Sequence, residues 1–329
     1  MNRTTVHALV TLSLGALAGP ATVLAEQAPK AVRIGVLRPA PDDAVFQRNF
    51  EPFRQFLQKN GYVEGRNLAI EYRVRAGSAG EMNALAADLV RLNPSAILAI
   101  APAGVQAAAK ATRTTPIVAV DLETDPIAAA FALSLARPGG NITGLFMDFP
   151  ELAGKWLELL REAAPKASRV AVLWDPATGP VLLRAAEAAA GVLRAQLQPL
   201  EARRPEDFDG AFRSAVRQRA GALLILTSPV FNSARRQIAD LAAKHRLPAI
   251  MGFPGFAEDG GLMAYGPHLE SMFHQAAGIM LKVLKGTPPG EIPLERPTRF
   301  ELIINLKTAK ALGISFPLSI RARADQVIE

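Results

Sequence analysis

Acidic side chains come in two short groups in the first half of the chain. Asp121, Glu123 and Asp125 stand at alternate positions, and Asp148 and Glu151 follow further on. Paired carboxylates can act as general acid and general base. Acidic residues after a strand are also ordinary helix caps and solvated loop residues. No nucleophile or metal-binding motif accompanies these carboxylates, so we expect no catalytic residues and no enzyme.

Other residues that commonly do chemistry are scarce. The chain has no Cys, which excludes disulfides, thiolate metal sites and cysteine nucleophiles. Its four His make no H-E-x-x-H motif, and the G-x-S-x-G turn of serine hydrolases is absent. Neither G-x-G-x-x-G nor Gly-Lys-Ser/Thr occurs, so both usual turns for a nucleotide phosphate are missing. We expect no metal and no cofactor.

The charge pattern argues against a nucleic-acid partner. The 329 residues include 37 Lys and Arg against 30 Asp and Glu, a net charge of +7. The basic residues are scattered, and the densest clusters are pairs such as Arg203-Arg204 and Arg235-Arg236. Aromatic residues make up only 6% and do not interleave with a basic stripe. We therefore expect a solvated, slightly basic surface.

The first 25 residues have the pattern of an export signal. Arg3 precedes the apolar run Ala8–Ala18, and Val23 and Ala25 are small residues at the expected cleavage site. The apolar run is too short to span a bilayer, which needs about 20 residues. We expect cleavage after Ala25 and a mature chain that is soluble, periplasmic and not inserted in the membrane.

From residue 31 onward, short apolar runs alternate with segments of helical periodicity. Such alternation predicts parallel sheets covered by helices on both faces. The fold class is therefore α/β, with two doubly wound parallel-sheet lobes in tandem. The expected strands are Val32–Leu37, Leu68–Tyr72, Ala96–Ala101, Pro116–Val120, Ile142–Met147, Val170–Trp174, Leu197–Leu200, Ala222–Leu226, Pro248–Phe253 and, closing the run, Leu262–Tyr265.

Several long motifs resemble one known family. They are GYVEGR (Gly61–Arg66), SLARPGGNITG (Ser134–Gly144), GGLMAYGP (Gly260–Pro267), PTRFELIINLKTAKALG (Pro297–Gly313) and RADQVIE (Arg323–Glu329). Together they resemble the ABC transporter substrate-binding protein family that includes tryptophan/tyrosine-binding TrpX-like proteins, across Val32 to Glu329.

The resemblance implies a periplasmic-binding-protein type I fold with a ligand cleft between two lobes and a three-segment hinge. We expect an N-terminal lobe of residues 26–145 and 266–293, and a C-terminal lobe of residues 146–265 and 294–329. Hinge crossings are expected near Leu145–Asp148, Gly266–His268 and Pro293–Phe300. The implied partners are a small-molecule ligand and an ABC permease with its ATPase.

Ligands of open α/β sheets bind beyond the carboxyl ends of the strands. Ala103 and Gly104 are expected to open a helix whose free N–H groups suit a carboxylate. Asp121, Asp125 or Asp175 would face an ammonium group, and Trp174 or Phe253 a flat side chain. Each residue also has an ordinary structural alternative: a helix cap, packing between elements, or a surface ion pair. The full set of candidate ligand-binding residues is Arg38, Ala103, Gly104, Asp121, Asp125, Trp174, Asp175, Thr227, Ser228 and Phe253.

These features favour an exported binding component of an ABC importer, with an amino acid or other small carboxylate as ligand. One alternative is a periplasmic ligand-sensing receptor subunit for a signalling kinase. An exported α/β enzyme is the third.

Overall fold

The computed structural model describes residues 32–39, 44–74, 79–147 and 150–329. The expected export signal, residues 1–25, lies outside the described residues, as does Asp148 at the first expected hinge crossing.

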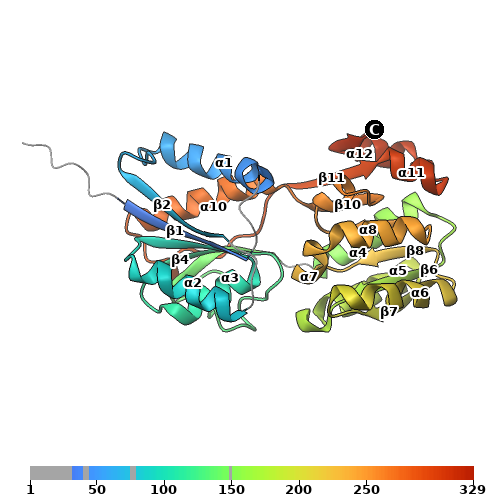
Figure 1. Cartoon of the computed structure of the whole chain (residues 1–329), viewed down its shortest axis with the longest axis horizontal. Helices are drawn as coiled ribbons and strands as arrows, with labels where there is room; N and C mark the ends of the chain where they lie inside the picture. Colours follow the sequence, from blue (N-terminus) through green and yellow to red (C-terminus); the bar gives the residue numbers. More distant parts are fainter. Residues whose placement is uncertain (1–31, 40–43, 75–78, 148–149) are drawn as a thin grey trace, which may run out of the picture. The chain divides into compact units, whose positions relative to one another are not determined.

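Five parallel strands form the first sheet, sheet A, in the order β2-β1-β3-β4-β5. Helices α1 and α10 pack against each other on one face, and α2 and α3 pack on the other (Figure 1). Alternate residues of β1 serve the two faces, because side chains alternate along a strand. Ile34 and Val36 join the core under α1 and α10, whereas Leu37 joins the core under α2 and α3. The elements are β1 (Val32–Arg38), α1 (Ala44–Lys59), β2 (Leu68–Val74), α2 (Ala79–Arg91), β3 (Ala96–Ile100), α3 (Ala101–Ala111), β4 (Ile117–Asp121), β5 (Ile142–Phe146) and α10 (Leu269–Leu284).

Seven strands form the second sheet, sheet B, in the order β12-β11-β10-β9-β8-β6-β7. Helices α4 and α5 cover one face, and α6 and α8 cover the other (Figure 1). In β6, Val172 joins the core under α4 and α5, and Leu173 joins the core under α6 and α8. The elements are α4 (Pro150–Ala163), β6 (Arg169–Trp174), α5 (Val181–Leu193), β7 (Gln196–Glu201), α6 (Phe208–Arg217), β8 (Ala222–Ile225), α7 (Pro229–Ser233), α8 (Arg235–Lys244), β9 (Ala249–Met251), α9 (Gly255–Glu258), β10 (Met263–Pro267), β11 (Phe300–Asn305), α11 (Leu306–Leu312), α12 (Leu318–Arg323) and β12 (Gln326–Ile328).

The end of the run of strands was predicted wrongly. Two further strands, β11 and β12, follow β10, and β11 runs antiparallel to β10. The run from Leu302 to Asn305 is buried because β11 lies between two strands. Since α11 begins at the next residue, no turn residue separates strand from helix, and the sequence offers no boundary there.

The order of the described elements places three connections between the two sheets. The chain leaves sheet A after β5, returns after β10 to form α10 on sheet A, and enters sheet B again at β11. The lobe boundaries and the hinge role of these connections remain predictions. In the described part of the chain, no helix combines the length and apolar character needed to cross a membrane.

Candidate functional site

A pocket of about 560 Å³ lies beyond the carboxyl ends of the strands. Its lining comes from both sheets: the ends of β1, β3 and β4, the starts of α1 and α10, and residues of α7, α8, α9, β11 and β12. This volume is within the range of small-molecule sites, about 300–1,000 Å³.

Aromatic side chains form the apolar part of the pocket. Phe46 of α1 and Phe273 of α10 meet edge to face, with ring centroids 6.0 Å apart. Leu122 after β4 and Phe253 after β9 complete this surface, and all four side chains are buried. The guanidinium carbon of Arg38 lies 4.4 Å from the centre of the Phe46 ring, a cation–π contact. The lining therefore offers apolar surface for a flat or branched side chain.

Helix α3 starts at the pocket without an intervening loop. Its first residue, Ala101, follows Ile100 of β3 directly and has a φ of 61°. This left-handed conformation is unusual for a residue other than glycine and often marks a functional site. The first-turn N–H groups of a helix have no acceptor within the helix. Pro102 has no N–H, so the donors of this turn are the N–H groups of Ala101, Ala103 and Gly104. Ile100 and Ala101 line the pocket, so the positive end of the helix dipole faces it.

Four glutamates also line the pocket: Glu123, Glu258, Glu270 and Glu301. Burial, reinforced by the nearby Asp121, raises the pKa of the Glu123 carboxyl to about 8. Burial and the neighbouring Asp325 raise the pKa of Glu301 to about 7. Both carboxyl groups therefore hold a proton more tightly than an ordinary glutamate does. A cation beside either group would lower its pKa again and favour loss of that proton.

Among the sequence-predicted residues of sheet A, only Arg38 lines this pocket. Asp121 is fully buried, and its Oδ1 accepts hydrogen bonds from the N–H groups of Glu123 and Thr124, at 3.1 and 3.0 Å. Burial raises the Asp121 pKa, although these hydrogen bonds oppose the shift. Asp125 is exposed, and its Oδ1 accepts from the N–H groups of residues 127 and 128. Asp121 and Asp125 thus hold the loop that presents Glu123.

Ala103 and Gly104 lie in the first turn of their helix, close to the predicted start. Helix α3 begins two residues earlier, at Ala101, and Gly104 lies within it. A Cβ on Gly104 would lie 3.1 Å from the backbone oxygen of Leu37, so this glycine allows the helix to pack closely on β1. The N–H of Ala103 still belongs to the first helical turn.

Among the predicted residues of sheet B, only Phe253 lines the pocket. Asp175 accepts hydrogen bonds from the Ala177 N–H at 2.9 Å and from the Ser228 hydroxyl at 2.7 Å. Ser228 also caps α7, since its Oγ accepts from the Val230 N–H. Within the described structure, the buried Oγ1 of Thr227 has no hydrogen-bond partner. The indole N–H of Trp174 donates to the Gly179 oxygen at 3.1 Å, which keeps this ring beside its own loop.

The sequence-based set missed several pocket residues. Phe46 and Phe273 belong to regular helix faces, where an apolar side chain looks like ordinary core. Glu301 belongs to β11, a strand that was not predicted. Glu123 had a signal, because it stands between two candidates in the carboxylate group after β4.

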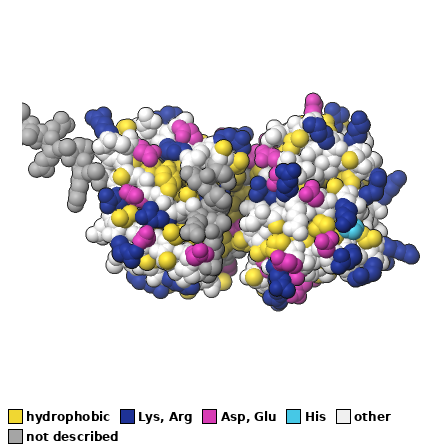
Figure 2. Space-filling view, in the orientation of Figure 1, with side chains coloured by type: hydrophobic (Ala, Val, Ile, Leu, Met, Phe, Trp, Pro, Cys, Tyr) yellow, Lys and Arg dark blue, Asp and Glu magenta, His cyan; other side chains and the backbone are white. Residues whose placement is uncertain are grey.

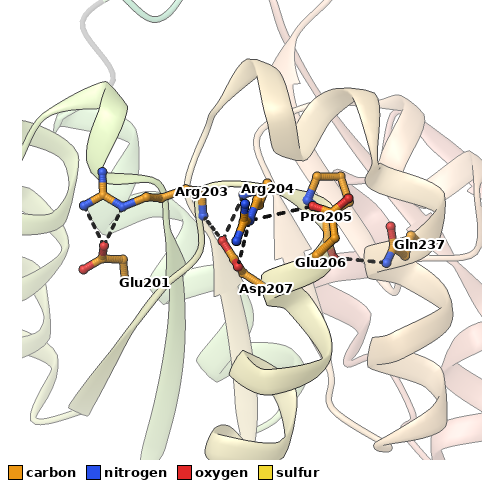
Figure 3. Close-up of polar contacts among 7 residues, drawn as sticks. All are labelled: Glu201, Arg203, Arg204, Pro205, Glu206, Asp207 and Gln237. Carbon is orange, nitrogen blue, oxygen red and sulfur yellow. Dashed lines mark hydrogen bonds and ion pairs between the residues drawn. The ribbon is translucent and has the colours of Figure 1, made fainter.

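A second hollow, of about 850 Å³, lies along β7 and the start of α6. Figure 3 shows that two of its arginines, Arg203 and Arg204, already have partners. Arg203 pairs with Glu201 at 2.7 Å, and Arg204 pairs with Asp207 at 3.4 Å, all on exposed or half-exposed side chains. This hollow has none of the aromatic surface of the first, so we take the first as the candidate ligand site.

Figure 2 shows positive and negative side chains interspersed over the visible face. Among the described residues, no three His, Asp or Glu side chains gather in a way that could hold a metal ion.

The model of the ABC transporter substrate-binding protein family matches residues 33–328, nearly the whole described chain. The chain belongs to this family. It is a class of binding proteins rather than enzymes, so the chain is a substrate-binding protein of an ABC transporter.

Similar proteins share part of this sequence or its fold. A tyrosine-binding protein from Clostridioides difficile is 26% identical over 265 residues, which are 80% of this chain and 75% of the relative. An ABC domain from Streptococcus pneumoniae, solved in complex with L-Trp, is 20% identical and has a TM-score of 0.81, covering 91% of this chain and all of that one. A leucine-binding protein from Thermotoga maritima has a TM-score of 0.59 at 15% identity, covering 77% of this chain and 83% of that one. These likenesses confirm the predicted α/β fold with two parallel-sheet lobes of the type I periplasmic-binding-protein class.

Proposed function

We propose that this protein is exported and captures an amino acid with an apolar, preferably aromatic, side chain, which it delivers to a membrane permease. The observation that carries the proposal is the composition of the pocket. Aromatic surface, the start of a helix and carboxylate groups line one space of about 560 Å³.

Each part of such a ligand has a matching part of the lining. The ligand carboxylate would accept hydrogen bonds from the first-turn N–H groups of α3, where the helix dipole favours negative charge. Its side chain would pack against Phe46, Phe253 and Phe273. Two relatives support this class, since one is named a tyrosine-binding protein and another was solved with L-Trp.

Delivery of the ligand to the permease requires no chemical reaction. It requires only that the ligand-free and ligand-bound proteins differ in conformation. A ligand that touches residues of both lobes stabilises the arrangement in which both can reach it. Hinge closure of this kind, about the three connections between the sheets, would give the permease a distinct form to recognise.

A thermal-shift titration of residues 26–329 tests the ligand class. L-tryptophan, L-tyrosine, L-leucine and ribose should be compared at equal concentrations. A ligand at 100 times its Kd stabilises the folded protein by about 2.7 kcal/mol, which corresponds to several degrees in Tm.

The expected result is a rise in Tm with at least one of the two aromatic amino acids and none with ribose. A rise with ribose and no response to either aromatic amino acid would overturn the proposed ligand class.

A further inference from the structure

The pocket gathers several carboxyl groups in a chain that is basic as a whole. The chain carries a net charge of +7, yet four glutamates line this one space. Within the described residues, none of these four side chains forms an ion pair. Of the three arginines that line the pocket, Arg235 is paired with Asp259, with Nε 2.8 Å from Oδ2. The pocket therefore holds carboxyl groups that a positively charged ligand group can pair with.

We propose that Glu123 binds the ammonium group of the ligand and releases a proton to solvent as it does so. This inference rests on the proposed function and adds the residue that recognises the cation and the proton that accompanies binding.

The positions of β3 and β4 favour Glu123 over the other three glutamates. These strands are hydrogen-bonded neighbours, and neighbouring strands lie about 4.8 Å apart. Helix α3 begins at the end of β3, and Glu123 stands two residues beyond the end of β4. The carboxylate and ammonium of an α-amino acid are attached to the same carbon. Two adjacent strand ends can therefore hold both groups of one ligand.

Glu123 is also held in place by its own loop. The buried Asp121 accepts hydrogen bonds from the N–H groups of Glu123 and Thr124, which fixes the backbone of the turn. By contrast, Glu258 is exposed, and Glu270 lies in the first turn of α10, where the helix dipole already favours its negative charge. Glu301 lies close to Arg299, whose positive charge opposes the rise in the Glu301 pKa.

The proton balance follows from the state of the free carboxyl group. With a pKa of about 8, Glu123 is mostly protonated at pH 7 in the free protein. An ammonium ion beside it favours the carboxylate. The neutral acid then gives its proton to solvent, and the carboxylate pairs with the intact ammonium ion. The other titratable or charged groups that face the same space are Arg38, Arg48, Arg235, His268, Glu258, Glu270 and Glu301, with Asp121 behind the loop.

Isothermal titration calorimetry counts this proton directly. L-tryptophan and L-tyrosine should be titrated into the wild-type protein at pH 7 and pH 8, in phosphate and in Tris, whose ionisation enthalpies differ. The expected release is about 0.9 proton at pH 7 and about 0.5 at pH 8, because the free carboxyl has a pKa near 8. N-acetyl-L-tryptophan, which lacks the ammonium group, should bind at least tenfold more weakly and release no proton.

Glu123→Gln keeps the size of the side chain and removes the charge. We expect it to weaken binding of the amino acid at least tenfold and to abolish proton release. The matched control is Glu187→Gln, an exposed glutamate on α5, which should bind as the wild type does. If Glu123→Gln does not fold, the number of protons that the wild-type protein releases on binding tests the role of Glu123 by itself.

The outcomes separate this inference from the proposed function. Tight binding of an aromatic amino acid without proton release, or with unchanged affinity in a folded Glu123→Gln variant, would overturn the role of Glu123 and leave the proposed function standing. Failure of both amino acids to bind the wild-type protein would overturn the proposed function and this inference with it.

Discussion

The hydroxyl of Ser228 donates a 2.7 Å hydrogen bond to Oδ2 of Asp175, and both side chains are buried. The two residues follow β8 and β6, which are neighbours in sheet B. Each also caps a short helix, because Asp175 accepts from the Ala177 N–H and Ser228 from the Val230 N–H. The pair thus joins two strand–helix turns at one edge of the sheet.

Ser228→Ala should reduce stability rather than ligand affinity. The substitution removes a hydrogen bond to a buried carboxylate and a helix cap, a loss of about 1.5–3 kcal/mol. Urea unfolding should show the loss, while the Kd for an aromatic amino acid stays within about twofold. A large loss of affinity with unchanged stability would instead place Ser228 at the ligand.

Replacing two glycines by alanine should change the stability of the protein in opposite directions. Gly144 of β5 has a φ of +141°, and a Cβ there would lie 2.1 Å from the backbone oxygen of Ala119. Gly144→Ala should therefore cost about 3 kcal/mol or more. Gly191 of α5 is exposed, and a Cβ there would have no atom of another residue within 4 Å. Gly191→Ala should therefore add about 0.5–1 kcal/mol to the free energy of unfolding. Chemical unfolding of both variants measures these changes. Equal changes in the free energy of unfolding of the two variants would contradict the prediction.

Much of the fold could be predicted because buried strands and amphipathic helices have different periods. The strand predicted at Ile142–Met147, for example, is observed as β5 at Ile142–Phe146. The candidate site was harder. Asp125 and Ser228 follow strands, as ligand-binding residues do, yet both cap turns, and one sequence pattern serves both roles. Phe46 and Phe273 reach the pocket through tertiary packing between α1 and α10, which no local pattern reports.

Stability without ligand should fall as pH rises from about 4.5 to about 8. Glu123 has an ordinary pKa of 4.5 in the unfolded chain and about 8 in the folded one, so the folded state binds its proton more tightly. The resulting stabilisation is fully present below pH 4.5 and is lost as pH rises through 8. Glu301, with a pKa of about 7, acts in the same direction.

Glu123→Gln should flatten this pH dependence, since glutamine does not titrate. Thermal melts of the wild type and variant at half-unit pH intervals would show it. Parallel curves for the two proteins across this range would contradict the assignment of the raised pKa to Glu123.

Export should leave a defined N-terminus. If residues 1–25 direct secretion, intact mass of the protein recovered from the periplasm should correspond to Glu26–Glu329. A cytoplasmic protein that retains Met1 would contradict the expected location.

The most direct test of the account is a crystal structure of residues 26–329 with L-tryptophan. We expect the ligand in the pocket at the ends of β3 and β4, with its carboxylate within hydrogen-bond distance of the first-turn N–H groups of α3. Its ammonium nitrogen should lie beside the Glu123 carboxylate, and its indole ring against Phe46, Phe253 or Phe273. A ligand bound elsewhere, or bound here with its ammonium away from Glu123 and its ring away from these phenylalanines, would contradict it.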